Sequence, residues 1–191
     1  MNSHKSTFSF LRQDFPLLTN LAESAESQFP TDPSVSALKL RVFGERLIDI
    51  LFVEYHLSVD KYSTYESRIN YLKSDDCITT DVANMLNILR TLGNKAAHTP
   101  YKITAKDAEL TLVSAFKLAQ WLYDGFSETP DLAVQNLVFQ LPTKFDATQI
   151  IADLEAKRAV LETLYAKTLA EKLALATTVK EKQEESEAFK S

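Results

Sequence analysis

The scarcity of glycine and proline is the feature that most limits how this chain can fold. Its 191 residues include only three glycines and six prolines. A sheet of many strands needs frequent turns, and these two residues make most of them. Long helices joined at a few points are therefore favoured, and we predict an all-α fold.

Apolar residues recur at helical spacing in five segments before residue 128. These segments are residues 15–29, 32–57, 64–74, 79–93 and 104–126. Asp32, Thr64, Thr79 and Thr104 stand at four of the starts, where short polar side chains cap a helix. With 45% hydrophobic residues, the chain can bury a core of one domain. We predict a bundle of about five helices over residues 1–128.

The pattern changes after Pro130. Residues 129–145 lack a clean period and contain Pro142, which indicates a connector. Residues 146–191 contain neither glycine nor proline and predict one long helix. At ~1.5 Å per residue such a helix is ~65 Å long, so it folds back, pairs with another chain or links to further protein. We favour the link, because Arg158 and Thr168 interrupt the heptad seam that pairing requires.

Charge and cysteine content restrict the classes of function. The net charge of −5 means that a nucleic-acid site must be a local basic patch. Cys77 is the single cysteine, so no internal disulfide and no cysteine zinc site can form. His4, His56 and His98 are too scattered for a metal site. The chain shows no signal peptide and no apolar span, so we expect a soluble, cytoplasmic protein without membrane contact.

The stretch RTLGNKAAH, residues 90–98, is the first candidate for chemistry. If the helix continues past Gly93, then Arg90, Asn94 and His98 share one face. An arginine, an amide and an imidazole could hold a phosphate and move a proton during RNA cleavage. The simpler interpretation is structural: Gly93 and Asn94 relax a tight backbone, and His98 bonds a carbonyl at the helix end.

Arg41 and Glu45, four residues apart on the most apolar helix, are the second candidate. Burying an unpaired charge costs several kcal/mol, so an ion pair between them is the structural interpretation. If the second and fourth helices pack side by side, Glu45 could orient His98 or Arg90. Arg41, Glu45, Asn94 and His98 then form one polar cluster that binds a ligand or fixes the bundle.

No other chemical motif is present in the sequence. It has no phosphate-binding glycine loop, no serine elbow and no nuclease motif of paired acids with a lysine. We therefore expect no cofactor and no metal in this chain.

Three stretches in order, FSFLRQDFPLL, AESAESQFPTDPSVSALKLRVFGERLIDILF and LRTLGNKAAH, resemble a known helical domain. It is the domain of unknown function at the N-terminus of type I restriction enzyme R subunits, and the resemblance covers residues 8–125. It implies an accessory module, itself without catalytic activity, that serves assembly or DNA handling. The implied partners are DNA and other restriction subunits. Residues 146–191 would link to nuclease and motor domains, to which the implied ATP and Mg²⁺ belong.

The same domain is similar to the HEPN superfamily of helical bundles, which often dimerise and include metal-independent RNases. Their motif is an arginine, a polar residue, three further residues and a histidine. Asn94 and His98 match it, whereas Gly93 holds the arginine position, and Arg90 lies one turn earlier. One alternative function is therefore a dimeric RNase that uses His98, Asn94 and Arg90. Another is a helical scaffold that dimerises through its tail.

Overall fold

The computed structural model describes residues 6–58, 62–98, 103–142 and 147–188. Parts of the predicted segments, residues 1–5, 143–146 and 189–191, lie outside these ranges. The described residues form helices and no strands, which confirms the predicted all-α class. The chain divides into two compact units, residues 1–144 and residues 145–191.

The described residues of the first unit form seven helical elements, and the starts of four of these follow the capping residues of the sequence. Asp32, Thr64, Thr79 and Thr104 each accept a backbone N–H with the side chain at a helix start. The elements are η1 (Ser9–Leu11), α1 (Pro16–Gln28), α2 (Pro33–Glu54), α3 (Tyr65–Ser74), α4 (Thr80–Ala97), α5 (Ala105–Phe126) and η3 (Leu132–Asn136).

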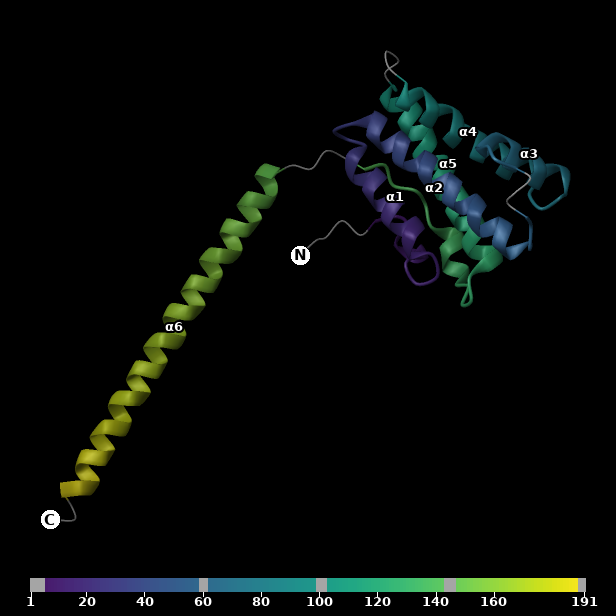
Figure 1. The fold of residues 1–191 in the computed structure, drawn as a ribbon. Coiled ribbons are helices and arrows are strands. Elements are labelled where there is room, and N and C mark those ends of the chain that lie inside the picture. The colour runs from purple at the N-terminus through teal and green to yellow at the C-terminus, as the bar shows by residue number, and fades with distance from the viewer. Residues whose placement is uncertain (1–5, 59–61, 99–102, 143–146, 189–191) are drawn as a thin grey trace. The chain divides into compact units, whose positions relative to one another are not determined.

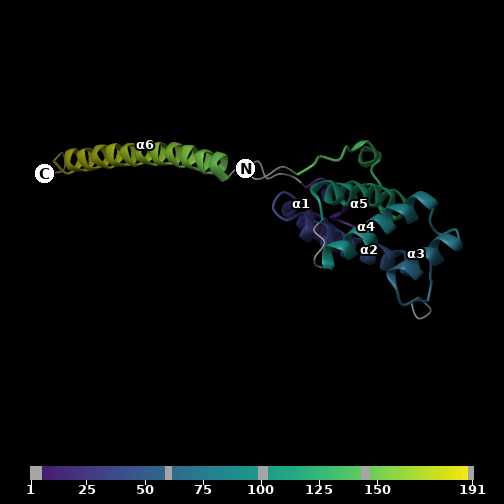
Figure 2. The same ribbon diagram turned by 90° about the horizontal axis from the view of Figure 1, so that it is seen from above.

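Helix α2 lies at the centre of the bundle, between α1, α4 and α5, and also contacts α3 (Figures 1 and 2). Phe43, Leu47, Ile48 and Leu51 on α2 are completely buried. Burying one such side chain contributes about 1.5–3 kcal/mol, so α2 supplies much of the stability of this unit.

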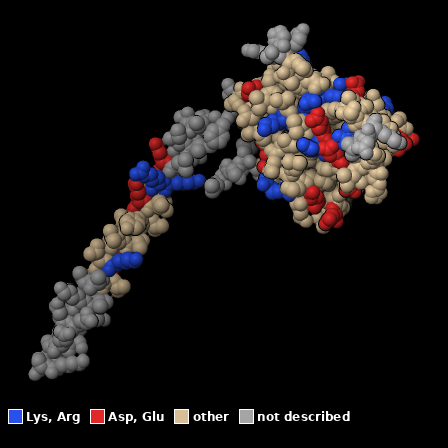
Figure 3. Space-filling view, viewed as in Figure 1, with Lys and Arg blue, Asp and Glu red and all other residues tan. Residues whose placement is uncertain are grey.

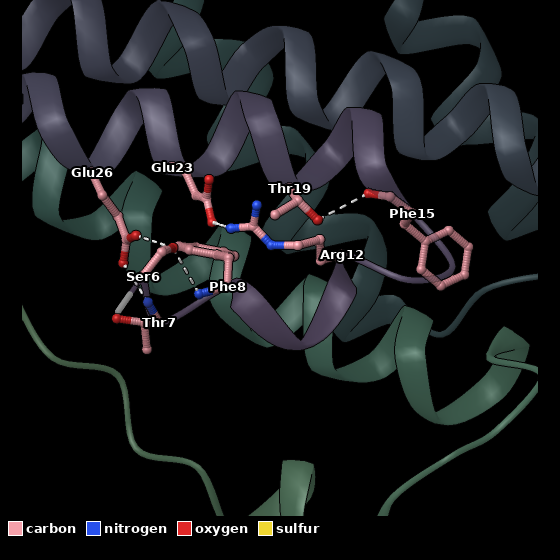
Figure 4. A network of polar contacts seen from close by, with 8 residues as sticks. All are labelled: Ser6, Thr7, Phe8, Arg12, Phe15, Thr19, Glu23 and Glu26. Atoms are coloured by element: carbon pink, nitrogen blue, oxygen red, sulfur yellow. Dashed lines mark hydrogen bonds and ion pairs between the residues drawn. The ribbon is translucent and has the colours of Figure 1, made fainter. Parts of the chain in front are cut away.

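The segment before α1 is fastened to α1 by two acidic side chains (Figure 4). The Glu26 carboxylate accepts a hydrogen bond from the Ser6 hydroxyl, and Arg12 forms an ion pair with Glu23. Between them Phe8 is completely buried in the core. The N-terminal segment is therefore part of the folded unit.

The connector, residues 129–145, packs on α5 through side chains of α5 and of the connector itself. Gln120 on α5 donates from its amide to the carbonyls of Val134 (2.8 Å) and Leu137 (3.1 Å). Phe139 lies 5.6 Å, between ring centroids, from Phe116 on the same helix. These hydrogen bonds and this ring contact hold the connector on α5.

Helix α6 (Ala147–Ala188) forms the second unit and is continuous over 42 residues. At 1.5 Å per residue this corresponds to about 63 Å, which confirms the predicted long C-terminal helix. Large apolar side chains remain exposed along it, among them Leu161 (69%), Tyr165 (70%) and Leu169 (48%). Arg158 and Glu162 form an ion pair of 2.8 Å on its surface.

Candidate functional site

Helices α2 and α4 come unusually close at Gly93. A Cβ atom added to this buried residue would lie 2.3 Å from the Cβ and 2.9 Å from the Cδ of Arg41. The aliphatic part of Arg41 therefore lies directly over Gly93. Because the backbone at Gly93 is helical, the position needs glycine for space and not for an unusual backbone angle.

A second close approach occurs at Gly44, one turn away on α2. A Cβ atom there would lie 1.9 Å from the hydroxyl oxygen of Tyr65 on α3 and 3.2 Å from Leu89 on α4. The two glycines thus mark the positions at which α3 and α4 approach α2. The polar side chains of the candidate site surround these positions.

Arg41 and Arg90 are both engaged in ion pairs with neighbouring acids. The Nη2 atom of Arg41 lies 2.9 Å from a carboxylate oxygen of Glu45. Arg90 lies 3.4 Å from Glu66 on α3, and its Nε donates to the Asn87 side chain at 3.1 Å. The Arg41–Glu45 pair is about one-third exposed, so it contributes at most about 1 kcal/mol to stability.

Tyr65 lies among these charges. Its hydroxyl is buried and makes no hydrogen bond to the described residues. Burial is the main cause that raises the pKa of Tyr65; the carboxylate of Glu45 raises it further, while Arg41 and Arg90 lower it. The phenol therefore stays protonated and can act as a hydrogen-bond donor.

The residues of the predicted RNase motif occupy the C-terminal turn of α4. The helix continues through Gly93 to Ala97, so Asn94 follows Gly93 on the same helix and is half-buried. His98 is exposed and caps the helix in an extended backbone conformation, where its backbone N–H donates to the Asn94 carbonyl at 3.2 Å. This contact is made by the backbone of His98 and not by its imidazole.

The two candidate groups from the sequence, residues 90–98 and the Arg41–Glu45 pair, meet only in part. Helices α2 and α4 do pack side by side, and Arg41 covers Gly93. Within the described residues, however, the ion pair of Glu45 is made with Arg41, and that of Arg90 with Glu66. The structure thus joins Arg41, Glu45 and the Gly93 turn, while His98 lies at the exposed end of α4.

A shallow pocket of about 340 Å³ opens next to this cluster, between α2 and α3. Asp49 on its wall forms two ion pairs. Its carboxylate oxygens lie 2.9 Å from Nη1 of Arg46 and 2.8 Å from Nη1 of Arg68. The Arg68 guanidinium carbon also lies 4.4 Å from the centre of the Phe52 ring. These groups could not be found from the sequence, because nothing in their spacing shows that α3 packs against α2.

The remaining candidates offer little for metal or cysteine chemistry. No group of three or more histidine, cysteine or acidic side chains in the described part of the chain could hold a metal ion. His4 lies outside the described residues. Burial, followed by the charges of Asp75 and Asp76, raises the pKa of Cys77, which makes it a poor nucleophile at neutral pH.

On the side of the bundle shown in Figure 3, basic and acidic side chains are interleaved. Within the described residues, no helix is long and apolar enough to cross a membrane.

This is an all-helical domain with a polar cluster at the contact of α2 with α3 and α4. Its sequence matches the domain of unknown function DUF4145 over residues 23–157, and the chain belongs to that family.

Among characterised proteins, the chain is 28% identical over 141 residues to the type I restriction enzyme EcoKI endonuclease subunit of Escherichia coli (strain K12). The match covers 74% of this chain and 12% of that protein. This relative supports the predicted relationship to restriction enzymes. Among solved structures, none matches the chain.

Proposed function

We propose that this chain is an accessory module of a type I restriction enzyme endonuclease subunit, without catalytic activity of its own. The observation that carries the proposal is the similarity to the EcoKI subunit, which is confined to 12% of that protein. A segment of 141 residues has the size of one domain, so the shared part is one module of a larger enzyme. The module takes no cofactor, and ATP and Mg²⁺ act in other domains.

The packing at Gly93 supports a non-catalytic role. In the HEPN-like motif an arginine stands at this position, and its Cβ would collide with the Cβ of Arg41. Atoms so near the backbone of α2 can move only if the helix itself moves. Arg90, the possible substitute, is already paired with Glu66 and Asn87.

One observation favours the alternative, a HEPN-like RNase acting as a dimer. The aliphatic part of Arg41 lies on Gly93, next to Asn94, while its guanidinium is paired with Glu45. In this alternative Arg41 holds the phosphate and His98 moves the proton. It requires metal-independent RNA cleavage that is lost in His98→Ala.

The partners and location follow from the restriction-enzyme proposal. The module acts in the cytoplasm, in contact with DNA and with other subunits of the restriction complex. Its role there is to assist assembly or to handle the DNA strand while other domains cut it.

The proposal can be tested by exchanging the shared segment in the EcoKI endonuclease subunit. The matching segment is deleted, or replaced by the corresponding residues of this chain, and restriction of unmodified phage is measured in Escherichia coli. We expect the deletion to abolish restriction and the replacement to restore it at least in part. Full restriction after deletion, or none after a replacement that folds and accumulates normally, would contradict the proposal.

A further inference from the structure

Helix α3 buries fewer residues than any other α-helix of the bundle. Two of its ten residues, Ile69 and Leu72, are buried, whereas α1, α2, α4 and α5 each bury between five and ten residues. Burial of apolar side chains is the main favourable contribution to packing a helix in a fold. Segments with few buried apolar contacts are the ones that open locally while the rest of a protein stays folded.

Charged side chains make much of the contact between α3 and its neighbours. Arg68 on α3 pairs with Asp49 on α2 at 2.8 Å, and Glu66 pairs with Arg90 on α4 at 3.4 Å. The side chain of Glu66 is 59% exposed and that of Asp49 is 39% exposed, so water competes for both pairs and each adds little to stability. Both pairs can therefore be exchanged for water at small cost when α3 moves away.

The closed position of α3 also leaves hydrogen-bond donors without acceptors. Five buried side-chain atoms in the described part of the chain make no hydrogen bond, and three of them belong to α3. These three are the Tyr65 hydroxyl and the Nε and Nη2 atoms of Arg68. They would bind water if α3 left its neighbours, so packing α3 sacrifices hydrogen bonds where it gains the burial of Ile69 and Leu72.

Helix α3 covers one side of the polar cluster when it is closed. The Tyr65 hydroxyl oxygen lies directly on Gly44, where a Cβ atom would be only 1.9 Å away. Next to this contact is Glu45, which is paired with Arg41. The ion pair with Glu66 holds Arg90 on the same side. The position of α3 therefore decides whether these groups are covered.

We propose that α3 is a lid, which opens from α2 and α4 as one unit while the remaining helices of the bundle stay folded. Opening releases Arg90 from Glu66 and lifts Tyr65 from Gly44, so the polar cluster becomes accessible from the side of α3. Closing covers it again. The lid is a property of the bundle alone and does not depend on the restriction-enzyme proposal.

Hydrogen exchange of the full chain, labelled with ¹⁵N and followed by NMR, measures the opening. The amide protons of residues 69–74 in α3 are compared with those of residues 43–50 in α2 and 85–91 in α4. We expect the α3 amides to exchange at least about a hundredfold faster than the most protected amides of α2 and α4, and to share one opening free energy. Exchange in α3 as slow as in α2 and α4 would overturn the inference.

Tyr65→Phe should hold the lid closed more firmly. It removes a donor without an acceptor and keeps the ring, so α3 should exchange about fivefold more slowly while α2 and α4 are unchanged. Tyr123→Phe is the matched control, because the Tyr123 hydroxyl donates to the Thr129 carbonyl at 3.1 Å, and it should not slow exchange in α3. If Tyr65→Phe leaves exchange in α3 unchanged or speeds it, the buried hydroxyl does not favour opening and the inference fails.

Glu66→Gln tests the lid in the opposite direction and leaves the core intact. Loss of the ion pair with Arg90 should speed exchange in α3 about twofold and leave α2 and α4 unchanged. Lys95→Gln, which breaks the pair with Asp107 at the joint of α4 and α5, should not change exchange in α3. If Glu66→Gln speeds exchange in all three helices alike, α3 opens only when the whole bundle unfolds and is not a lid.

Discussion

The bundle and helix α6 are both helical, but they differ in what the helices bury. On α2 nine residues are buried, among them Phe43, Leu47 and Leu51. On α6 every side chain described between residues 155 and 175 is exposed, including five leucines. The comparison teaches that the position of a helix follows local features such as capping residues and the absence of glycine and proline, whereas burial requires neighbouring helices.

The first prediction sharpens this comparison by truncating one leucine in each region. Leu47→Ala should destabilise the bundle by about 3 kcal/mol, because it opens a cavity in a completely buried position. Leu169→Ala, at a residue that is 48% exposed on α6, should change stability by less than about 0.5 kcal/mol. Urea unfolding followed by circular dichroism measures both. Equal effects would mean that α6 is as well packed as α2.

The second prediction compares two glycines on helices of the bundle, one buried and one exposed. Gly93→Ala should destabilise by about 2 kcal/mol, because the new methyl group meets Arg41 near the backbone of α2. Gly125→Ala on α5 meets no atom within 4 Å and should stabilise by about 0.5 kcal/mol. Thermal unfolding of the two variants distinguishes them. If Gly93→Ala were as stable as Gly125→Ala, the close contact between Gly93 and Arg41 would be contradicted.

The third prediction concerns the joint between α4 and α5. Burial acts to raise the pKa of Asp107, but hydrogen bonds from Lys95 and Thr104 outweigh it, and the pKa is lowered. A lowered pKa stabilises the fold above the unfolded pKa, and this contribution is lost as the pH falls through the folded pKa. Asp107→Asn should therefore cost less than about 1 kcal/mol at pH 7 and nothing in strong acid.

This pH dependence is checked by measuring urea midpoints of Asp107→Asn and the unchanged protein at several pH values. The two curves should begin to approach each other near pH 4, where the carboxyl group of the unfolded chain becomes protonated, and should meet once the pH has fallen through the lower pKa of the folded state. A difference that persists unchanged into acid would show that the charge of Asp107 plays no part.

The smallest expected effect comes from removing α6 altogether. A chain of residues 1–144 should melt within about 2 °C of the full chain, because the bundle has its own core. Differential scanning calorimetry, together with light scattering for the mass, tests this. A fall of many degrees, or a dimer that becomes a monomer, would show that α6 supports the bundle or pairs two copies.

The sequence allowed the helices and their starts to be predicted, because these depend on local chemistry. Asp32, Thr64, Thr79 and Thr104 each cap the helix that their position predicted. The end of α4 was harder, because glycine usually weakens a helix. Here the helix continues past Gly93, where the close contact with Arg41 requires a residue without a side chain.

The candidate site could be predicted only in part. The Arg41–Glu45 pair follows from a spacing of four residues on one helix. Tyr65, Glu66 and Arg68 belong to the site only because α3 packs beside α2 and α4, which no local pattern reveals. The pairing of Arg90 with Glu66 was missed for the same reason.

Incubating the purified full chain with RNA in the presence of EDTA tests the central claim, a module without catalysis, most directly. We predict no cleavage. The motif arginine is replaced by Gly93, where Arg41 leaves no room for a side chain, and Arg90 is paired with Glu66. Cleavage that disappears in both His98→Ala and Arg41→Gln would contradict the claim and establish an RNase that takes its arginine from α2.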